Sequence, residues 1–340
     1  MTAQQIETLI EQRNVPEKTN TLRLVETHIS WVLLTDQFAY KIKKPLQFSF
    51  LDFSTLDARK YSCERELILN QRLTSGVYLN VLPVRQYNSA IKIDGEADGR
   101  IIDYTVQMKR LDANRQMHTL LESNKIEAIQ IKQLAIQLAD FHNKTNIIKA
   151  PFDLQDLNEK FIDILKIGDF VKKNWGANSQ EILETAVQLS TQFLEKNTQR
   201  FQERSAQGFV IDGHGDLHSG NIFLLDEPVI FDCIEFNDSF RYVDMLDEIA
   251  FLCLDFDFYN RPDLEHLFLK EYFQRMPCIQ NETDQKIFLY YKLYRANVRL
   301  KVTCLGAMQN NSADQDLSIA QRYLQLLKTY CNNLLIVDRV

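Results

Sequence analysis

The segment Asp212-Gly-His-Gly-Asp-Leu-His-Ser-Gly-Asn-Ile222 constrains the fold of this chain more than any other stretch. The chain has only 10 glycines in 340 residues, and four of them lie in or just before this segment, at positions 208, 213, 215 and 220. Glycine at this density indicates backbone angles or close approaches that other residues do not allow. Short apolar stretches flank the segment at 209–211, 222–225 and 229–231 and predict strands. We therefore predict a tight polar loop held between short strands.

The rest of the chain separates into a strand-rich part and a helix-rich part. Early helices are predicted at 2–13 and 56–73, and strands at 31–35, 38–43, 81–84, 90–93 and 101–108. After Leu111, apolar residues at helical spacing predict helices around 131–141, 154–173, 179–203 and through most of 242–335. A chain of 340 residues is also long for a single core. We expect an α+β fold with two domains, residues 1–107 and residues 108–340.

Composition restricts the partners and the compartment. A net charge of −7 argues against broad binding to nucleic acid or to an anionic membrane. The six cysteines are scattered without a Cys-x-x-Cys pair, so neither structural zinc nor a disulfide framework is expected. The N-terminal stretch carries Glu7 and Glu11 and does not read as a signal peptide, and no apolar run has the length of a membrane span. These features predict a cytoplasmic protein.

Three polar residues in and after the glycine-rich loop have the spacing of a phosphoryl-transfer site. Asp216 lies five positions before Asn221, and Asp232 follows beyond a short predicted hairpin. Phosphoryl transfer needs a carboxylate that orients the attacking hydroxyl, and oxygen ligands that hold magnesium. We therefore predict Asp216 as the catalytic residue and Asn221 and Asp232 as Mg²⁺ ligands. The alternative is a polar turn without chemistry, and we expect His214 and His218 to support the loop in either case.

The loop also resembles a known family. His214-Gly-Asp-Leu-His-Ser-Gly-Asn221 resembles the His-x-Asp-Leu-x-x-x-Asn catalytic loop of the protein-kinase-like fold, in the form typical of aminoglycoside phosphotransferases and choline kinases. Val229-Ile-Phe-Asp-Cys-Ile-Glu-Phe236 resembles the metal-binding segment of that family. Together with Tyr40-Lys-Ile-Lys-Lys-Pro45 and Phe50-Leu-Asp-Phe-Ser-Thr55, these motifs are similar to an uncharacterised bacterial group of aminoglycoside-phosphotransferase-like proteins. The resemblance covers nearly the whole chain. It implies a protein-kinase-like two-lobe fold, with a β-rich N-lobe containing one main helix and a mainly helical C-lobe.

The same resemblance places a nucleotide site in the first domain. Phe38-Ala-Tyr-Lys41 parallels the Val-Ala-Ile-Lys strand of kinases, and Lys43 lies on the same strand face, so both lysines are candidates for phosphate binding, with Lys41 preferred. Glu66 is the first choice for the acid that pairs with the lysine, and Glu64 is also present on that helix. Backbone groups of Met108, Lys109 and Leu111 would hold adenine. No glycine-rich loop precedes Lys41, which is a departure from protein kinases. No Gly-x-x-x-x-Gly-Lys-Ser/Thr sequence occurs, which excludes a P-loop kinase.

An acidic stretch follows the predicted metal-binding segment. Residues 235–265 contain nine acids, at positions 235, 238, 244, 247, 248, 255, 257, 263 and 265, against Arg241 and Arg261. Such a stretch can attract a cationic acceptor, or its members can be solvated helix faces and structural caps. Both interpretations are open from the sequence.

The leading functional hypothesis is a Mg²⁺-dependent kinase that transfers the γ-phosphoryl group of ATP or GTP to a hydroxyl of a small molecule. A nucleotide-binding pseudokinase without turnover is the alternative. A metallohydrolase is a third possibility, because Gly215-Asp-Leu-His218 resembles the Gly-Asp-x-His of metallophosphatases. The chain lacks the further histidine and aspartate ligands that a two-metal site needs.

Overall fold

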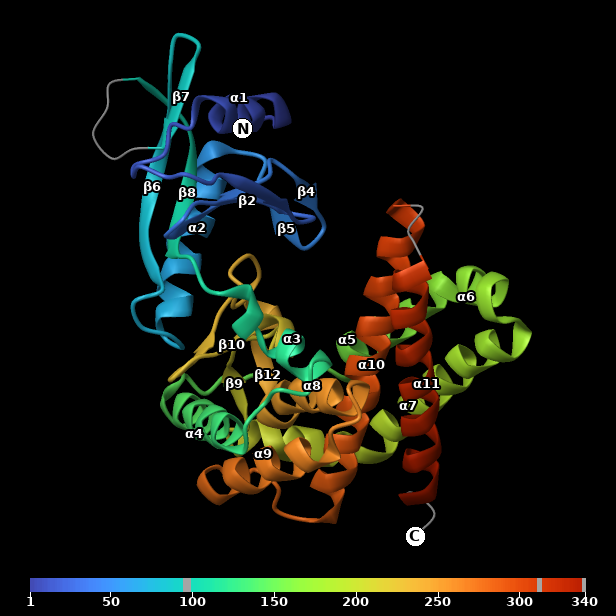
Figure 1. The fold of residues 1–340 in the computed structure, drawn as a ribbon. Helices are drawn as coiled ribbons and strands as arrows, with labels where there is room; N and C mark the ends of the chain where they lie inside the picture. Colours follow the sequence, from blue (N-terminus) through green and yellow to red (C-terminus); the bar gives the residue numbers. More distant parts are fainter. Residues whose placement is uncertain (94–98, 311–313, 338–340) are drawn as a thin grey trace. The chain divides into compact units, whose positions relative to one another are not determined.

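Residues 1–93, 99–310 and 314–337 are described by a computed structural model (Figure 1). The chain divides into two units. The first unit contains Met1–Leu120 and Gly220–Arg241, and the second contains Leu121–Ser219 and Tyr242–Val340. The first is rich in strands and the second is mostly helical, which confirms the predicted α+β fold class. The predicted boundary between two functional domains, residues 1–107 and residues 108–340, stays a prediction.

A six-stranded antiparallel sheet forms the body of the first unit. Its order is β1-β2-β3-β8-β6-β7 (Figure 1). The strands are β1 (Arg23–Glu26), β2 (Ser30–Leu34), β3 (Phe38–Lys43), β6 (Tyr78–Tyr87), β7 (Ala90–Ile93) and β8 (Arg100–Lys109). In β3, Ala39 is opposite Met108 and Lys41 is opposite Val106 of β8. This register places the predicted lysine strand directly beside the strand that leads to the predicted adenine-binding segment.

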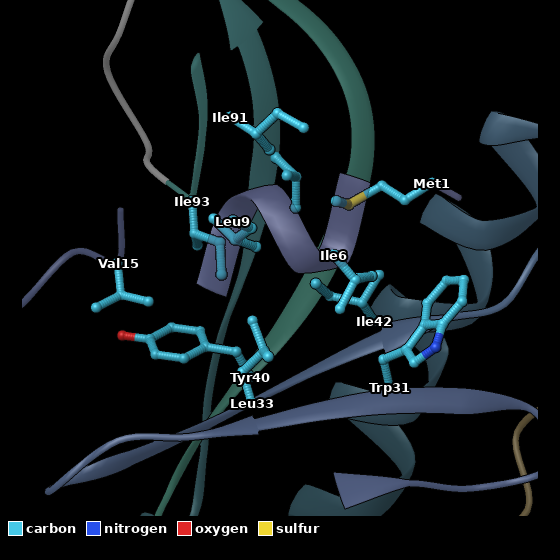
Figure 2. Close-up of a cluster of buried hydrophobic side chains, with 11 residues drawn as sticks. Met1, Ile6, Leu9, Val15, Trp31, Leu33, Tyr40, Ile42, Ile91 and Ile93 are labelled. Carbon is cyan, nitrogen blue, oxygen red and sulfur yellow. The ribbon is translucent and has the colours of Figure 1, made fainter. Parts of the chain in front are cut away.

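Two helices cover this sheet. Helix α1 (Ala3–Gln12) begins at a Thr2 capping box and turns Ile6 and Leu9 toward apolar side chains of the strands, including Leu33 and Ile42 (Figure 2). Helix α2 (Leu56–Gln71) begins at Thr55 and packs against β6 and β8. Because α2 lies against the sheet, its inward-facing polar residues are buried.

Two short hairpins complete the first unit. One joins β4 (Gln47–Phe48) to β5 (Leu51–Asp52), and the other joins β10 (Ile222–Leu224) to β11 (Pro228–Ile230). The second hairpin pairs Ile222 with Ile230 and places the predicted metal ligands at its open end. A 3-10 turn at Ala113–Arg115 and helix α3 (Met117–Glu122) follow the sheet.

Helices form most of the second unit. They are α4 (Ala128–Lys144), α5 (Leu154–Ile162), α6 (Gly168–Trp175), α7 (Ala177–Ala206), α8 (Met245–Phe258), α9 (Pro262–Arg275), α10 (Glu282–Asn310) and α11 (Asp314–Val337). Every residue of α8 except Asp257 is buried, so α8 is the core helix of this unit. It packs against α9 and α10, and α10 and α11 run side by side (Figure 1). Strand β9 (Val210–Asp212) pairs with β12 (Tyr242–Asp244) immediately before the glycine-rich loop and before α8.

Most predicted elements are present within one to three residues of their expected bounds. The predicted helix 154–173 is instead divided into α5, a 3-10 turn at Asp163–Ile167 and α6. Strand β12 was not predicted, because three residues are too few to show the alternation of a strand.

Candidate functional site

The two candidate lysines of β3 converge on one glutamate of α2. Residues two apart on a strand point to the same face, so Lys41 and Lys43 both reach Glu66. The Lys41 Nζ lies 2.8 Å from Glu66 Oε1, and the Lys43 Nζ lies 2.6 Å from Glu66 Oε2. Glu66 is fully buried and Lys43 is 1% exposed. The acid predicted from the sequence therefore pairs with both lysines rather than with one.

The segment after β11 brings two further carboxylates to these lysines. Asp232 Oδ1 lies 2.5 Å from the Lys41 Nζ, and Glu235 forms an ion pair with Lys43. The Asp232 side chain is 42% exposed, whereas the Glu235 side chain is buried. The Phe53 ring lies 5.0 Å from the Lys43 Nζ. Lys41 is thus next to the accessible carboxylate, and Lys43 is enclosed by buried groups.

Burial and ion pairing oppose each other in this cluster. Burial alone would raise the pKa of Glu66, but Lys41 and Lys43 outweigh it and lower the pKa to about 2. Burial raises the pKa of Glu235 more than Lys43 lowers it. Three carboxylates, those of Glu66, Asp232 and Glu235, face two ammonium groups.

Hydrogen bonds to the backbone fix the position of Asp232. Its N–H donates to the Tyr78 hydroxyl at 3.0 Å, and the next N–H, of Cys233, donates to Asn70 Oδ1 at 2.9 Å. Asp232 has a φ of 63°, a left-handed conformation that is uncommon for residues other than glycine. Such conformations persist where the surrounding structure holds them, and they concentrate at functional sites.

The β10–β11 hairpin brings Asn221 beside the Asp232 segment. The Phe231 N–H donates to the Asn221 backbone oxygen at 3.0 Å, so Asn221 lies opposite the residue that precedes Asp232. An amide oxygen and a carboxylate are suitable Mg²⁺ ligands, because Mg²⁺ takes one or two protein oxygens and otherwise keeps waters and phosphates. Among the described residues there is no group of three or more His, Cys, Asp or Glu side chains that could hold a metal ion. The donor set fits a nucleotide-bound magnesium better than an all-protein metal centre.

Apolar residues of β3 and β8, next to the segment predicted to bind adenine, pack in the core of the first unit. Ala39, Val106 and Met108 belong to one buried cluster with Phe223 and Val229 of the β10–β11 hairpin.

The polypeptide leaves the sheet after Lys109, the last residue of β8. The Lys109 N–H donates to the Val77 oxygen at 2.8 Å, which keeps Lys109 paired with the sheet. The backbone N–H and C=O of Leu111 form no hydrogen bond with any of the residues that the structure describes. The role of Leu111 in binding adenine stays a prediction.

The glycine-rich loop belongs to the second unit up to Ser219, and Glu248 of α8 holds its backbone. Glu248 Oε1 accepts hydrogen bonds from the N–H of His214 at 2.5 Å and of Gly215 at 2.8 Å. Glu248 Oε2 lies 2.8 Å from His142 Nε2, and His142 Nδ1 lies 2.6 Å from the Tyr272 hydroxyl. These contacts lower the pKa of Glu248 to about 2, although burial alone would raise it.

Gly213 fits this arrangement because it has no side chain. A Cβ at position 213 would lie 2.4 Å from Glu248 Oε2. The carboxylate has no room to move, since its hydrogen bonds fix both oxygens.

Asp216 follows the part of the loop that Glu248 holds. Its N–H donates to His214 Nδ1 at 3.2 Å, which gives His214 the supporting role expected from the sequence. Asp216 Oδ2 lies 3.4 Å from His218 Nε2, and the Asp216 side chain is 40% exposed. Burial would raise the pKa of Asp216, but His218, His214 and Arg299 together hold it below its ordinary value. Asp216 is therefore an accessible carboxylate that is ionised at neutral pH.

The predicted site residues are distributed over both units. Lys41, Lys43, Glu66, Asn221, Asp232, Met108, Lys109 and Leu111 belong to the first unit. Asp216 belongs to the second. Within the first unit the structure brings together both lysines, Glu66 and Asp232.

Sequence reasoning missed the roles of Glu235, Asn70 and Tyr78. The signal for Glu235 was present, because it is an acid between Ile234 and Phe236 in an apolar stretch close to Asp232. Asn70 and Tyr78 had no such signal, since their roles depend on where α2 and β6 lie in three dimensions.

The nine acids of residues 235–265 all have partners. Arg204, Arg295 and Lys292 pair with Asp244, Asp247 and Glu265 respectively. The others are engaged by side chains or backbone N–H groups, at positions 235, 238, 248, 255, 257 and 263. Of the two interpretations that the sequence left open, the structure supports the structural one. The acids of the stretch are thus engaged within the protein, but they are not each balanced by a cation, because Asp255 accepts from a backbone N–H and Asp257 and Glu265 share Lys292.

Within the described residues, no helix is both long and apolar enough to cross a membrane.

Comparison with known proteins identifies the fold. No protein-family model matches the chain. Uncharacterised proteins of Mycobacterium tuberculosis and Mycobacterium bovis are 29% identical over 318 residues, which cover 88% of this chain and 59% of the relatives. The chain therefore spans less than two thirds of the length of these curated relatives.

Solved structures resemble the chain over nearly all of its length. An ethanolamine kinase of Plasmodium vivax matches with a TM-score of 0.51 and 10% identity, covering 97% of this chain and 87% of the other. A choline/ethanolamine kinase family protein of Mesorhizobium loti matches with a TM-score of 0.52 and 13% identity, covering 94% and 89%. A GDP complex of a mutant aminoglycoside 2'-phosphotransferase-IIIa matches with a TM-score of 0.50 and 14% identity, covering 96% of both chains. The chain has the protein-kinase-like fold of these enzymes, as its sequence motifs predicted.

Proposed function

We propose that this protein is a Mg²⁺-dependent phosphotransferase that moves the γ-phosphoryl group of ATP or GTP to a hydroxyl of a small molecule. The observation that carries the proposal is the cluster of Lys41, Glu66 and Asp232 in one unit. A lysine held by a helix glutamate and set beside a carboxylate is the arrangement that a nucleotide triphosphate with its metal requires. The shared fold with ethanolamine kinase and aminoglycoside phosphotransferase supports this assignment.

Lys41 and Lys43 have different roles in this proposal. Lys41 is next to the accessible Asp232, so it is the lysine that binds the nucleotide phosphates. Lys43 is enclosed between Glu66 and Glu235 and holds the 232–235 segment against β3. The pair thus supports a phosphate-binding function for one lysine and a positioning function for the other.

Different groups of the first unit would bind the nucleotide base and the metal ion. The buried cluster around Ala39 and Met108 provides an apolar surface for the base, and the backbone of Leu111 provides the polar groups that orient it. Asn221 and Asp232 would hold Mg²⁺, which neutralises charge on the transferring phosphoryl group when bound. The donor and acceptor of Leu111 belong to the backbone. They therefore do not select between adenine and guanine in the way that a polar side chain could.

Asp216 orients the acceptor hydroxyl in this proposal. Its carboxylate is ionised and partly exposed, and Glu248 fixes the backbone on which it depends. The carboxylate accepts a hydrogen bond from the hydroxyl. As the hydroxyl oxygen bonds to the γ-phosphorus, the bond from that phosphorus to the nucleoside diphosphate breaks and the hydroxyl proton passes to the Asp216 carboxylate.

A two-part experiment tests the proposal. Nucleotides are screened by thermal shift with and without Mg²⁺, and the protein is then assayed for nucleoside diphosphate release with a panel of hydroxyl compounds. The proposal expects Mg²⁺-dependent stabilisation by ATP or GTP, followed by release that depends on an acceptor. Stabilisation by nucleotide without turnover of any acceptor would favour the pseudokinase alternative. Failure of both triphosphates to bind would refute the proposal.

A further inference from the structure

The three buried arginines of the second unit are paired in the same way. Each of Arg200, Arg204 and Arg295 donates two hydrogen bonds to a single carboxylate, of Asp284, Asp244 and Asp247 respectively. The donor–acceptor distances of these six hydrogen bonds are 2.7 or 2.8 Å. A bidentate ion pair of this kind is the usual way to stabilise a guanidinium away from water.

Arg299 of α10 is half-buried and is paired differently. Its Nε donates to the Tyr323 hydroxyl at 3.1 Å, and its guanidinium carbon lies 5.4 Å from the centre of the Tyr323 ring. Its two terminal nitrogens have no hydrogen-bond acceptor within the portion of the chain that the structure describes. The guanidinium is thus oriented by Tyr323 while its terminal donors remain available.

Contacts on one face of α10 connect Arg299 to the catalytic loop. Arg295 lies one helical turn before Arg299, and its guanidinium carbon is 4.6 Å from the centre of the Phe251 ring. The other neighbour of that ring is His218, whose ring centre lies 5.4 Å from it and whose Nε2 lies 3.4 Å from Asp216. The face of α10 that carries Arg299 is therefore the face directed toward Asp216.

The charges around Arg299 agree with this placement. Burial alone would lower the pKa of Arg299, but Tyr323, Asp255 and Asp216 together raise it. Neither aspartate forms an ion pair with Arg299, and Asp255 Oδ2 already accepts from the Ser219 N–H of the loop at 2.7 Å. Arg299 thus contributes an oriented cation beside the residue that we assign to the acceptor hydroxyl.

We infer that Arg299 binds an anionic group of the acceptor, a carboxylate or a phosphate, and that the acceptor is a hydroxyl compound carrying such a group. The inference rests on the proposed function, because it identifies the acceptor side with the surroundings of Asp216. A guanidinium with two available donors matches two oxygens of a carboxylate or phosphate and does not match an ammonium group.

Matched acceptors test the inference. The wild-type protein is assayed for nucleoside diphosphate release, from whichever of ATP and GTP it binds, with a hydroxy acid and its amide, a sugar phosphate and its free sugar, and an aminosugar. We expect the anionic member of a pair to be used and its neutral partner to be used at least tenfold less well. Comparison of the hydroxy acid with the sugar phosphate identifies whether a carboxylate or a phosphate is bound. Preferred use of a neutral or cationic compound would overturn the inference.

Variants of Arg299 separate acceptor binding from nucleotide binding. We expect Arg299→Ala to raise the KM for the anionic acceptor about 10- to 100-fold, which is the loss of hydrogen bonds to a charged group, with nucleotide Kd unchanged. Arg299→Lys keeps the charge and should fall between wild type and Arg299→Ala. Arg275→Ala, at an exposed arginine of α9, is the matched control. An equal weakening of nucleotide binding would instead assign Arg299 to the nucleotide phosphates and overturn the inference.

A measurement without turnover distinguishes failure of this inference from failure of the proposed function. Sodium sulfate is compared with sodium chloride at equal ionic strength in thermal-shift experiments on wild type and Arg299→Ala. General salt effects act equally on both proteins, so the inference expects a larger sulfate-specific shift in the wild type. A larger shift in the wild type would support the inference even if no acceptor supports turnover. Equal shifts in the two proteins would overturn the inference.

Discussion

Removing the Glu248 carboxylate tests how the backbone of the glycine-rich loop is held. Glu248→Ala removes the acceptor for two buried backbone donors, the N–H groups of His214 and Gly215, and the partner of His142. Hydrogen bonds to a charged group contribute about 1.5–3 kcal/mol each. The two backbone donors alone therefore predict a loss of about 3–6 kcal/mol in the free energy of unfolding. This is a large fraction of the roughly 5–15 kcal/mol typical of a folded protein.

Glu248→Gln provides the matched comparison. The amide oxygen can still accept from His214 and Gly215, and the amide nitrogen can donate to His142 Nε2 when His142 carries its proton on Nδ1 and donates to Tyr272. The variant then loses the charge and retains the hydrogen bonds, so we expect a cost of about 1–2 kcal/mol. Glu195→Ala, at an exposed glutamate of α7, controls for the loss of an acid from a helix.

Urea unfolding followed by circular dichroism and tryptophan fluorescence measures these differences. We expect wild type and Glu195→Ala to be equally stable, Glu248→Gln to be less stable, and Glu248→Ala to be the least stable. Gly213→Ala is an independent check, because its Cβ would clash with Glu248 Oε2 at 2.4 Å. Gly213→Ala should cost less in the Glu248→Ala background than alone. A cost for Glu248→Ala no greater than that of Glu195→Ala, or additive costs for the Gly213 and Glu248 changes, would refute this account of the loop.

Further predictions concern the charged cluster and pH. Lys41→Ala should weaken Mg²⁺–nucleotide binding about 10- to 100-fold in a titration, with only a small change in Tm. Lys43→Ala should mainly destabilise the protein, by about 3–5 kcal/mol in urea unfolding, because it leaves Glu235 buried without its cation, and equal effects of the two lysine variants would contradict the assigned roles. Asp232→Asn should remove the Mg²⁺ dependence of nucleotide binding, and an unchanged Mg²⁺ titration would rule Asp232 out as a ligand. The lowered pKa of Glu248, about 2 against an ordinary 4.5, stabilises the folded state above pH 4.5, and this contribution is lost as the pH falls toward 2. The free energy of unfolding should therefore fall more steeply over that range in wild type than in Glu248→Gln, and parallel curves would contradict the assigned pKa.

Residues with a local signature could be predicted from the sequence. Strand alternation placed Lys41 and Lys43 on one face, and helical spacing identified the helix that carries Glu66. The glycine-rich loop was recognisable because its glycines and polar residues occur at fixed spacing, which depends only on neighbouring residues.

Residues whose role depends on tertiary packing could not be predicted in the same way. The sequence left Lys41 and Lys43 as competitors, because alternation cannot show that Glu235 encloses one of them. The acidic stretch had two interpretations, because its partners, such as Arg204 and Arg295, are distant in sequence and meet it only in the folded unit. Arg299 gave no signal at all, since the absence of a carboxylate partner is a property of the folded structure.

The transfer of a phosphoryl group onto a hydroxyl is the central claim, and ³¹P NMR of the reaction mixture tests it most directly. Wild-type protein, Mg²⁺, ATP or GTP and an acceptor found in the panel are incubated, and the phosphorus spectrum is followed alongside that of Asp216→Ala. The account predicts a new phosphomonoester resonance that grows as nucleoside diphosphate appears. It also predicts that Asp216→Ala loses this product while retaining nucleotide binding. Formation of inorganic phosphate alone, or undiminished product with Asp216→Ala, would contradict it.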